Sequence, residues 1–82
     1  MNYQVEFKPR AIKDIKSWSI EDRRRIMKKI AGLQEDLSGD VKQLTNFTPE
    51  YRLRIGVFRV LFEVVGDRVI VYRIKHRKDV YR

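Results

Sequence analysis

The strongest constraint on the fold is the segment 51–62, in which apolar and cationic residues alternate on both sides of Gly56. Alternation with a period of two predicts strands with one apolar and one polar face. A two-residue turn at Gly56-Val57 would make the segment a β-hairpin and place Arg54 directly opposite Arg59. Like charges that face each other destabilise a sheet. These cations therefore bind something polyanionic, or they form a solvated outer face that guards the sheet against edge pairing.

The composition predicts a small globular protein without a cofactor. The 82 residues suit one domain, residues 1–82, whose short chain implies marginal stability, and 43% apolar content is enough for a core. The absence of Cys and the single His exclude disulfides and argue against a metal site, so we expect no metal and no other cofactor. No apolar run is long enough to cross a membrane and no signal peptide opens the chain, so the expected location is cytoplasmic.

Positive charge is concentrated in two separate regions of a chain whose net charge is +8. Residues 8–30 contain nine Lys or Arg against three acids, and residues 49–82 contain nine against four. The intervening residues 31–48 are slightly acidic. Two basic regions suit a nucleic acid, an acidic protein partner, or both.

Two helices are expected before the hairpin. Residues 3–7 alternate and predict a strand, and Pro9 suits the first turn of a helix that contains further apolar residues at helical spacing. A second helix opens with the capping-box pattern at residues 19–22 and ends near residues 38–40. Residues 41–44 are a candidate short strand. The second helix carries one apolar stripe, formed by Ile26, Ile30, Leu33 and Leu37.

The register of the last two strands, 58–65 and 69–75, depends on their turn. A two-residue turn at Gly66-Asp67 would place Val60 opposite Arg73 and put Ile74 on the charged face. A three-residue turn at residues 66–68 instead pairs Val60, Phe62 and Val64 with Ile74, Tyr72 and Ile70. Because a slip of one residue exchanges the two faces, the apolar pattern favours the three-residue turn.

The predicted fold class is α+β. Two amino-terminal helices pack on the apolar face of a twisted, mainly antiparallel sheet of three or four strands. The opposite face stays open and is strongly basic, and it is expected to carry Arg52, Arg54, Arg59, Leu61, Glu63, Val71, Arg73 and Lys75.

The order of elements, together with four motifs, resembles the RelE/ParE toxin superfamily of bacterial type II toxin–antitoxin modules. The resemblance covers nearly the whole chain, and its last motif is the most specific. The motifs are residues 3–7 (YQVEF) with Ala11, residues 51–56 (YRLRIG), residues 58–62 (FRVLF) and residues 74–81 (IKHRKDVY).

This resemblance implies one of two activities. RelE-type members are ribosome-dependent endoribonucleases that cut mRNA in the decoding site, whereas ParE-type members bind DNA gyrase and trap it. Because fold does not fix function, the site must decide between them. We favour a RelE-type mRNA interferase whose partners are the ribosome with its mRNA and a cognate antitoxin. A ParE-type toxin and a non-catalytic RNA-binding module are the alternatives.

The resemblance also implies roles for residues that match the family's motifs. Cleavage by the 2′-hydroxyl needs the negative charge on the phosphorane stabilised, and RelE-like enzymes use basic residues on the sheet for much of this. By motif position, Arg54 and Arg59 would bind phosphate and stabilise the transition state, while Arg52 would position the RNA backbone. Arg77 and Tyr81 match the family's terminal basic residue and tyrosine. Tyr81 would stack on a base or orient the attacking hydroxyl, unless it only packs on the sheet edge.

The general base is not evident from the sequence. Arg52 and Arg54 replace lysines of some family members, and arginine does not lose its proton in proteins. His76 is the only side chain with an unperturbed pKa near neutrality, so it is a candidate acid or base. Its position in the alternation points it to the apolar face, so a bulge or the strand end must redirect it, or it merely ends the strand. Glu50 and Glu63 are weaker candidates, and Glu63 is expected to pair with a basic neighbour such as Arg73.

Four further cations are candidate RNA contacts. Arg73 and Lys75 lie on the predicted basic face of the sheet. Arg24 and Lys28 belong to the clusters 23–25 and 28–29, which lie mostly off the apolar stripe of the second helix. These clusters would hold ribosomal RNA phosphates, or they form an ordinary solvated helix face.

Overall fold

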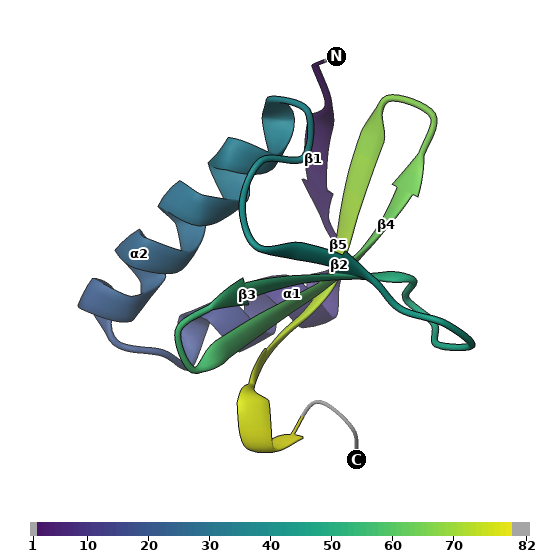
Figure 1. Ribbon diagram of the computed structural model, residues 1–82. Coiled ribbons are helices and arrows are strands. Elements are labelled where there is room, and N and C mark those ends of the chain that lie inside the picture. Colours follow the sequence, from purple (N-terminus) through teal and green to yellow (C-terminus); the bar gives the residue numbers. More distant parts are fainter. Residues whose placement is uncertain (1, 80–82) are drawn as a thin grey trace.

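The computed structural model describes residues 2–79, in which helices lie on one face of a five-stranded sheet (Figure 1). The strand order is β1-β5-β4-β3-β2, with β1 parallel to β5 and the other pairs antiparallel. The α+β class is confirmed, and the sheet has five strands rather than three or four. In chain order the elements are β1 (Gln4–Phe7), α1 (Pro9–Lys16), α2 (Ile20–Ala31), the 3₁₀ turn η1 (Gly32–Gln34), β2 (Val41–Gln43), β3 (Tyr51–Ile55), β4 (Phe58–Val65), β5 (Arg68–His76) and the 3₁₀ turn η2 (Arg77–Asp79).

The helices begin where the sequence predicts. Pro9 opens α1, and the Ser19 hydroxyl caps α2 by accepting a hydrogen bond of 3.2 Å from the backbone N–H of Asp22. The predicted end of α2 near residues 38–40 is wrong, because the helix ends at Ala31 and continues only as η1. Asp36 and Leu37 then have φ values of 55° and 57°, a left-handed conformation that no α-helix contains.

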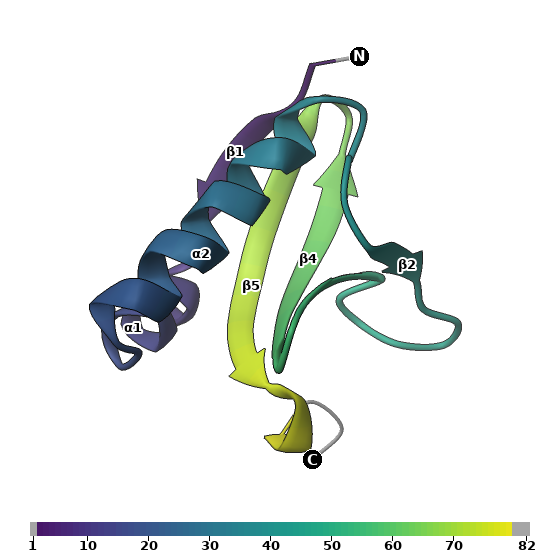
Figure 2. The ribbon, with the colours of Figure 1, turned by 60° about the vertical axis from the view of Figure 1, so that its left-hand side comes forward.

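The hydrophobic core lies between the helices and the sheet face beneath them. Figure 2 shows α2 running in front of β1 and β5. All four residues of the predicted stripe face the core, but only Ile26 and Ile30 belong to α2, since Leu33 lies in η1 and Leu37 follows it. The sheet contributes Leu53, Ile55, Phe58, Val60, Phe62, Val69, Val71 and Ile74 to the core.

No helix among residues 2–79 is long and apolar enough to cross a membrane.

The hairpin of β3 and β4 has the predicted two-residue turn. Gly56 takes a φ of 56° at the first turn position, which is the conformation that favours glycine in such turns. Ile55 pairs with Phe58, so Arg54 lies directly opposite Arg59 as predicted.

The hairpin of β4 and β5 corrects the predicted register. Its turn contains two residues, Gly66 and Asp67, because Val65 pairs with Arg68. A β-bulge at Tyr72 then adds one unpaired residue to β5, so that Val60 still lies opposite Ile74 as predicted.

The bulge changes which residues of β5 enter the core. Phe62 and Val64 pair with Val71 and Val69, not with Tyr72 and Ile70. Val71 is therefore buried, and its predicted place on the open face is wrong. The alternation restarts after Tyr72, which leaves the cations that follow it on the open face.

Asp14 of α1 accepts hydrogen bonds from β5 just beyond the point where β1 stops pairing with that strand. The last β1–β5 pair is Phe7 with Val71, and Asp14 then accepts a 2.9 Å hydrogen bond from the backbone N–H of Ile74. The Asp14 carboxylate also accepts bonds from Nε and Nη2 of Arg73, at 2.8 and 3.1 Å. These bonds raise the pKa of Arg73, an effect that partial burial opposes. The pair therefore fixes α1 against the sheet.

Replacing Asp14 with alanine is expected to destabilise the protein by about 1–3 kcal/mol, because it leaves the Ile74 amide and the Arg73 guanidinium without this acceptor. Urea unfolding followed by circular dichroism measures the change. Lys13→Ala, an exposed substitution on the same helix, is the control and should change the free energy of unfolding by less than about 0.5 kcal/mol. Equal effects of the two substitutions would contradict a structural role for Asp14.

Candidate functional site

The open face of the sheet carries two adjacent rows of cations. In the first row Arg54, Arg59 and Lys75 lie directly opposite one another on β3, β4 and β5. Side chains that oppose one another across strands have β-carbons only about 5 Å apart. The second row lies two residues further along each strand, roughly 7 Å away. It contains Lys42, Arg52, Leu61 and Arg73.

We call the six cations of these rows the basic face: Lys42, Arg52, Arg54, Arg59, Arg73 and Lys75. Five of them are predicted by the alternation. Lys42 is not, because β2 contains only three residues and offers too short a pattern. Its position opposite Arg52 extends the basic face onto a fourth strand.

Arg54 has a carboxylate beside it at the end of the first row. Its Nε donates a 2.6 Å hydrogen bond to Oδ2 of Asp40, and its backbone N–H donates to the Asp40 carbonyl at 3.0 Å. Both side chains are exposed, and exposed ion pairs contribute roughly 1 kcal/mol or less. A phosphate can therefore replace the carboxylate at little cost.

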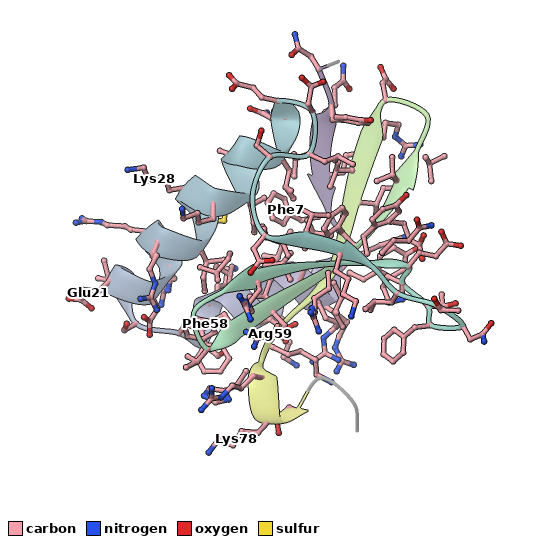
Figure 3. All side chains as sticks on the ribbon, in the orientation of Figure 1. Phe7, Glu21, Lys28, Phe58, Arg59 and Lys78 are labelled. Carbon is pink, nitrogen blue, oxygen red and sulfur yellow. The ribbon has the colours of Figure 1, made fainter. Side chains whose placement is uncertain are left out.

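Arg59 is held by neutral backbone groups at the β3–β4 turn. Its Nη1 donates to the carbonyls of Gly56 at 2.7 Å and Phe58 at 2.9 Å. Figure 3 shows Arg59 and Phe58 at the same end of the sheet. These two bonds orient the Arg59 guanidinium at the turn.

Two residues of the second row, Leu61 and Arg73, make contacts that stabilise the fold. Leu61 is buried on this face between Arg52 and Arg73, whose aliphatic stems flank it. The predicted pairing of Glu63 with Arg73 is wrong, since Arg73 binds Asp14 and Glu63 accepts a 2.9 Å hydrogen bond from the Glu50 N–H. An RNA contact by Arg73 stays a prediction, and it would compete with Asp14.

The carboxyl end of β5 brings Arg77 to the same turn as Arg59. The backbone N–H of Arg77 donates to the Val57 carbonyl at 2.7 Å, next to the Gly56 carbonyl that binds Arg59. Two site residues that lie far apart in the sequence are therefore attached to neighbouring turn residues. Tyr81 lies outside the described residues, so its predicted role stays a prediction.

His76 lies on the helix-covered side of the sheet, not on the basic face. It pairs with Phe58, and the two rings meet edge to face with centroids 6.3 Å apart. A β-bulge does occur in β5, at Tyr72, four residues before His76. The alternation resumes after the bulge and places His76 on the apolar side, so the bulge does not turn it to the basic face. Its Nδ1 accepts a 3.2 Å hydrogen bond from the Lys78 N–H, which in the neutral ring leaves the proton on Nε2. This arrangement does not favour His76 as the general base.

The cations of α2 divide into groups with different surroundings. Arg23 donates from Nε to the Trp18 carbonyl at 2.8 Å and from Nη2 to the Lys16 carbonyl at 3.0 Å, so it secures the link between the helices. Arg24 and Lys28 are exposed, and Figure 3 shows Lys28 projecting away from the sheet. The structure does not bring these two into the basic face, and their RNA contacts stay predictions.

The remaining features offer little catalytic chemistry. Within residues 2–79, no group of three or more His, Cys, Asp or Glu side chains is arranged to hold a metal ion. A pocket of about 180 Å³ between β1 and α2 has mainly apolar walls. Its lining residues are Val5, Phe7, Met27, Ile30, Ala31 and Gln34, and none of them is charged.

The sequence has known relatives. Residues 5–81 match the family described as the ParE toxin of type II toxin–antitoxin system, parDE. Toxin RelE3 of Methanocaldococcus jannaschii is 35% identical over 83 residues, which cover 95% of this chain and 94% of that protein.

Solved structures share the fold. The RelB–RelE antitoxin–toxin complex from Methanococcus jannaschii contains a chain with a TM-score of 0.77 and 32% identity, and the match covers 93% of this chain and 94% of that one. The chromosomal ParDE system from P. aeruginosa contains a chain with a TM-score of 0.74 at 14% identity, covering 90% and 95% of the two chains. The second likeness is one of fold alone.

Proposed function

Since this chain belongs to the RelE/ParE superfamily of toxins from type II toxin–antitoxin systems, we propose that it is a RelE-type endoribonuclease that cleaves mRNA on the ribosome. The observation that carries the proposal is the first row of the basic face, where Arg54, Arg59 and Lys75 lie side by side. Three cations at this spacing suit a chain of phosphates.

The proposed roles follow from the chemistry of each side chain. Arg59 and Arg54 stabilise the charge that develops on the phosphorane, since guanidinium groups keep their charge and offer a fork of donors to phosphate oxygens. Arg52 positions the RNA backbone. Lys75 is the residue of the first row that can release a proton, so we assign it the protonation of the 5′-oxygen. The 2′-oxygen forms a bond to phosphorus as the bond to the 5′-oxygen breaks, and the proton of the 2′-hydroxyl passes to water.

The ribosome supplies what the site lacks. No self-sufficient set of base, nucleophile and acid is evident among the described residues, so stabilisation of charge has to be combined with a substrate already held in a reactive geometry. Precise alignment of the 2′-hydroxyl with the phosphate is worth several orders of magnitude in rate. We assign that alignment to the ribosomal decoding site.

The antitoxin is the proposed regulatory partner. The relatives of known structure include an antitoxin–toxin complex. On a chain of net charge +8, we propose that an acidic segment of the cognate antitoxin covers the basic face or the helices and keeps the toxin off the ribosome.

The proposal predicts the cellular target. Expression of the protein is expected to stop translation and to produce mRNAs cut within codons, and cleavage of the same mRNA in vitro should require ribosomes. Primer extension on a reporter mRNA, with and without purified ribosomes, measures both. DNA supercoiling and gyrase–DNA cleavage complexes are followed in parallel.

The parallel assay separates the two branches of the superfamily. Intact mRNA together with accumulating gyrase–DNA complexes would replace the nuclease proposal with a ParE-type activity. RNA binding without either effect would leave a non-catalytic RNA-binding module.

A further inference from the structure

We propose that Arg25 of α2 belongs to the same RNA-binding surface, which continues from the basic face around the β3–β4 turn onto the helix. The ligand at Arg25 is a backbone phosphate of single-stranded RNA. This inference rests on the proposed function, and it separates Arg25 from the other cations of α2.

Arg25 reaches the turn from the helix-covered side of the sheet. Its guanidinium carbon lies 5.9 Å from the centroid of the Phe58 ring, and its Nη2 comes within 3.9 Å of the point that a β-carbon on Gly56 would occupy. Phe58 is buried and meets Trp18 edge to face at 4.9 Å, so it is a fixed support for the guanidinium.

Arginines approach Gly56 from both faces of the sheet. Arg59, which emerges on the basic face, donates to the Gly56 carbonyl at 2.7 Å, and Arg25 approaches the same residue from α2. The Arg77 N–H binds the next carbonyl, that of Val57. The guanidinium groups of Arg59 and Arg25 therefore flank one turn from the two faces of the sheet. The backbone of Arg77 is hydrogen-bonded to the same turn.

Arg25 is accessible to a phosphate. Its side chain is 52% exposed, and its ion pair with Asp22, at 3.3 Å and three residues apart on the helix, is also exposed. Exposed ion pairs between residues three apart on a helix are weak, so a phosphate can displace the carboxylate. Arg23 differs in position, because its guanidinium binds the carbonyls of Trp18 and Lys16 at the link between the helices and not at the β3–β4 turn.

A flexible single strand suits this surface better than a duplex. Arg59 and Arg25 reach the β3–β4 turn from opposite faces of the sheet, and the turn residue Val57 is exposed, so a ligand that contacts both arginines must bend around the turn. Single-stranded RNA can follow such a path, with phosphates on the cations and a base against the apolar tip.

The test measures binding of a fluorescent single-stranded RNA oligonucleotide to the full chain by anisotropy over a range of salt concentrations, without ribosomes. Arg25→Gln is expected to weaken binding several-fold at low salt and to reduce the slope of log K against log salt by about 0.7, the value for one lost phosphate contact. Arg25→Lys should keep the slope. Arg10→Gln, an exposed arginine of α1, is the matched control and should leave binding unchanged.

Arg59→Ala in the same assay separates this inference from the proposed function. If Arg59→Ala weakens binding while Arg25→Gln equals Arg10→Gln, the inference about Arg25 is overturned and the proposed function stands. If Arg59→Ala also leaves binding unchanged, the RNA-binding role of the basic face itself is overturned. Circular dichroism of each variant establishes that the compared proteins are folded.

Discussion

Replacing Arg59 with alanine is expected to reduce ribosome-dependent mRNA cleavage by about 10²–10³-fold, the usual effect of removing one donor to a developing oxyanion. The side chain lies on the open face and outside the core, so the variant should keep its fold despite the loss of two hydrogen bonds to turn carbonyls. Single-turnover cleavage on programmed ribosomes measures the rate, and growth after induction measures toxicity.

A matched control for Arg59 exists on the same face of the sheet. Arg68 lies opposite Val65 at the other end of β5, where it binds Glu6 of β1 rather than belonging to the basic face. Arg68→Ala removes the same charge and should leave cleavage within about two-fold of the unsubstituted protein, because the added effect of one distant surface charge is screened. Full toxicity of a folded Arg59→Ala variant would exclude Arg59 from the site.

Replacing Phe62 with alanine is expected to destabilise the protein by about 3–5 kcal/mol. Phe62 is fully buried at 0% exposure, and it stacks on Tyr51 of the neighbouring strand with ring centroids 5.4 Å apart. Native proteins are stable by only about 5–15 kcal/mol, so the substitution would remove a large fraction of the total stability. Equilibrium urea unfolding at 25 °C measures the change.

Val65→Ala provides the comparison within the same strand. Val65 is 52% exposed, so its truncation should change the free energy of unfolding by less than about 0.5 kcal/mol. A cost below about 1 kcal/mol for Phe62→Ala would mean that the core is loosely packed around β4, contrary to the structure.

Much of the fold follows from local patterns in the sequence. The alternation around Gly56 predicts the first hairpin and the pairing of Arg54 with Arg59, because the side-chain period and the turn length together determine the register. The second hairpin is harder to predict. Its turn contains two residues, whereas its apolar residues would face the core without a bulge only if the turn contained three. The Tyr72 bulge resolves this conflict, and no local pattern distinguishes a bulge in mid-strand from a longer turn.

The surroundings of the site could not be predicted in the same way. Asp14 reaches Arg73 and Asp40 reaches Arg54 only after folding, and neither pair has a characteristic spacing in the sequence. The approach of Arg25 to Gly56 likewise depends on how α2 lies on the sheet. Alternation in the sequence predicts which face of the sheet a cation lies on. The acids and helices that surround it are determined by tertiary packing, which the local sequence does not show.

The strand order has a consequence for how the protein is synthesised. β5 is translated after every other strand, yet it lies between β1 and β4 and joins them. A nascent chain that lacks β5 therefore has its first strand without a partner, and the first cation row lacks Lys75. Contacts between such distant segments also form slowly. Co-translational folding can thus yield helices and the β3–β4 hairpin, while the assembled site arises only once residues 68–76 have left the exit tunnel.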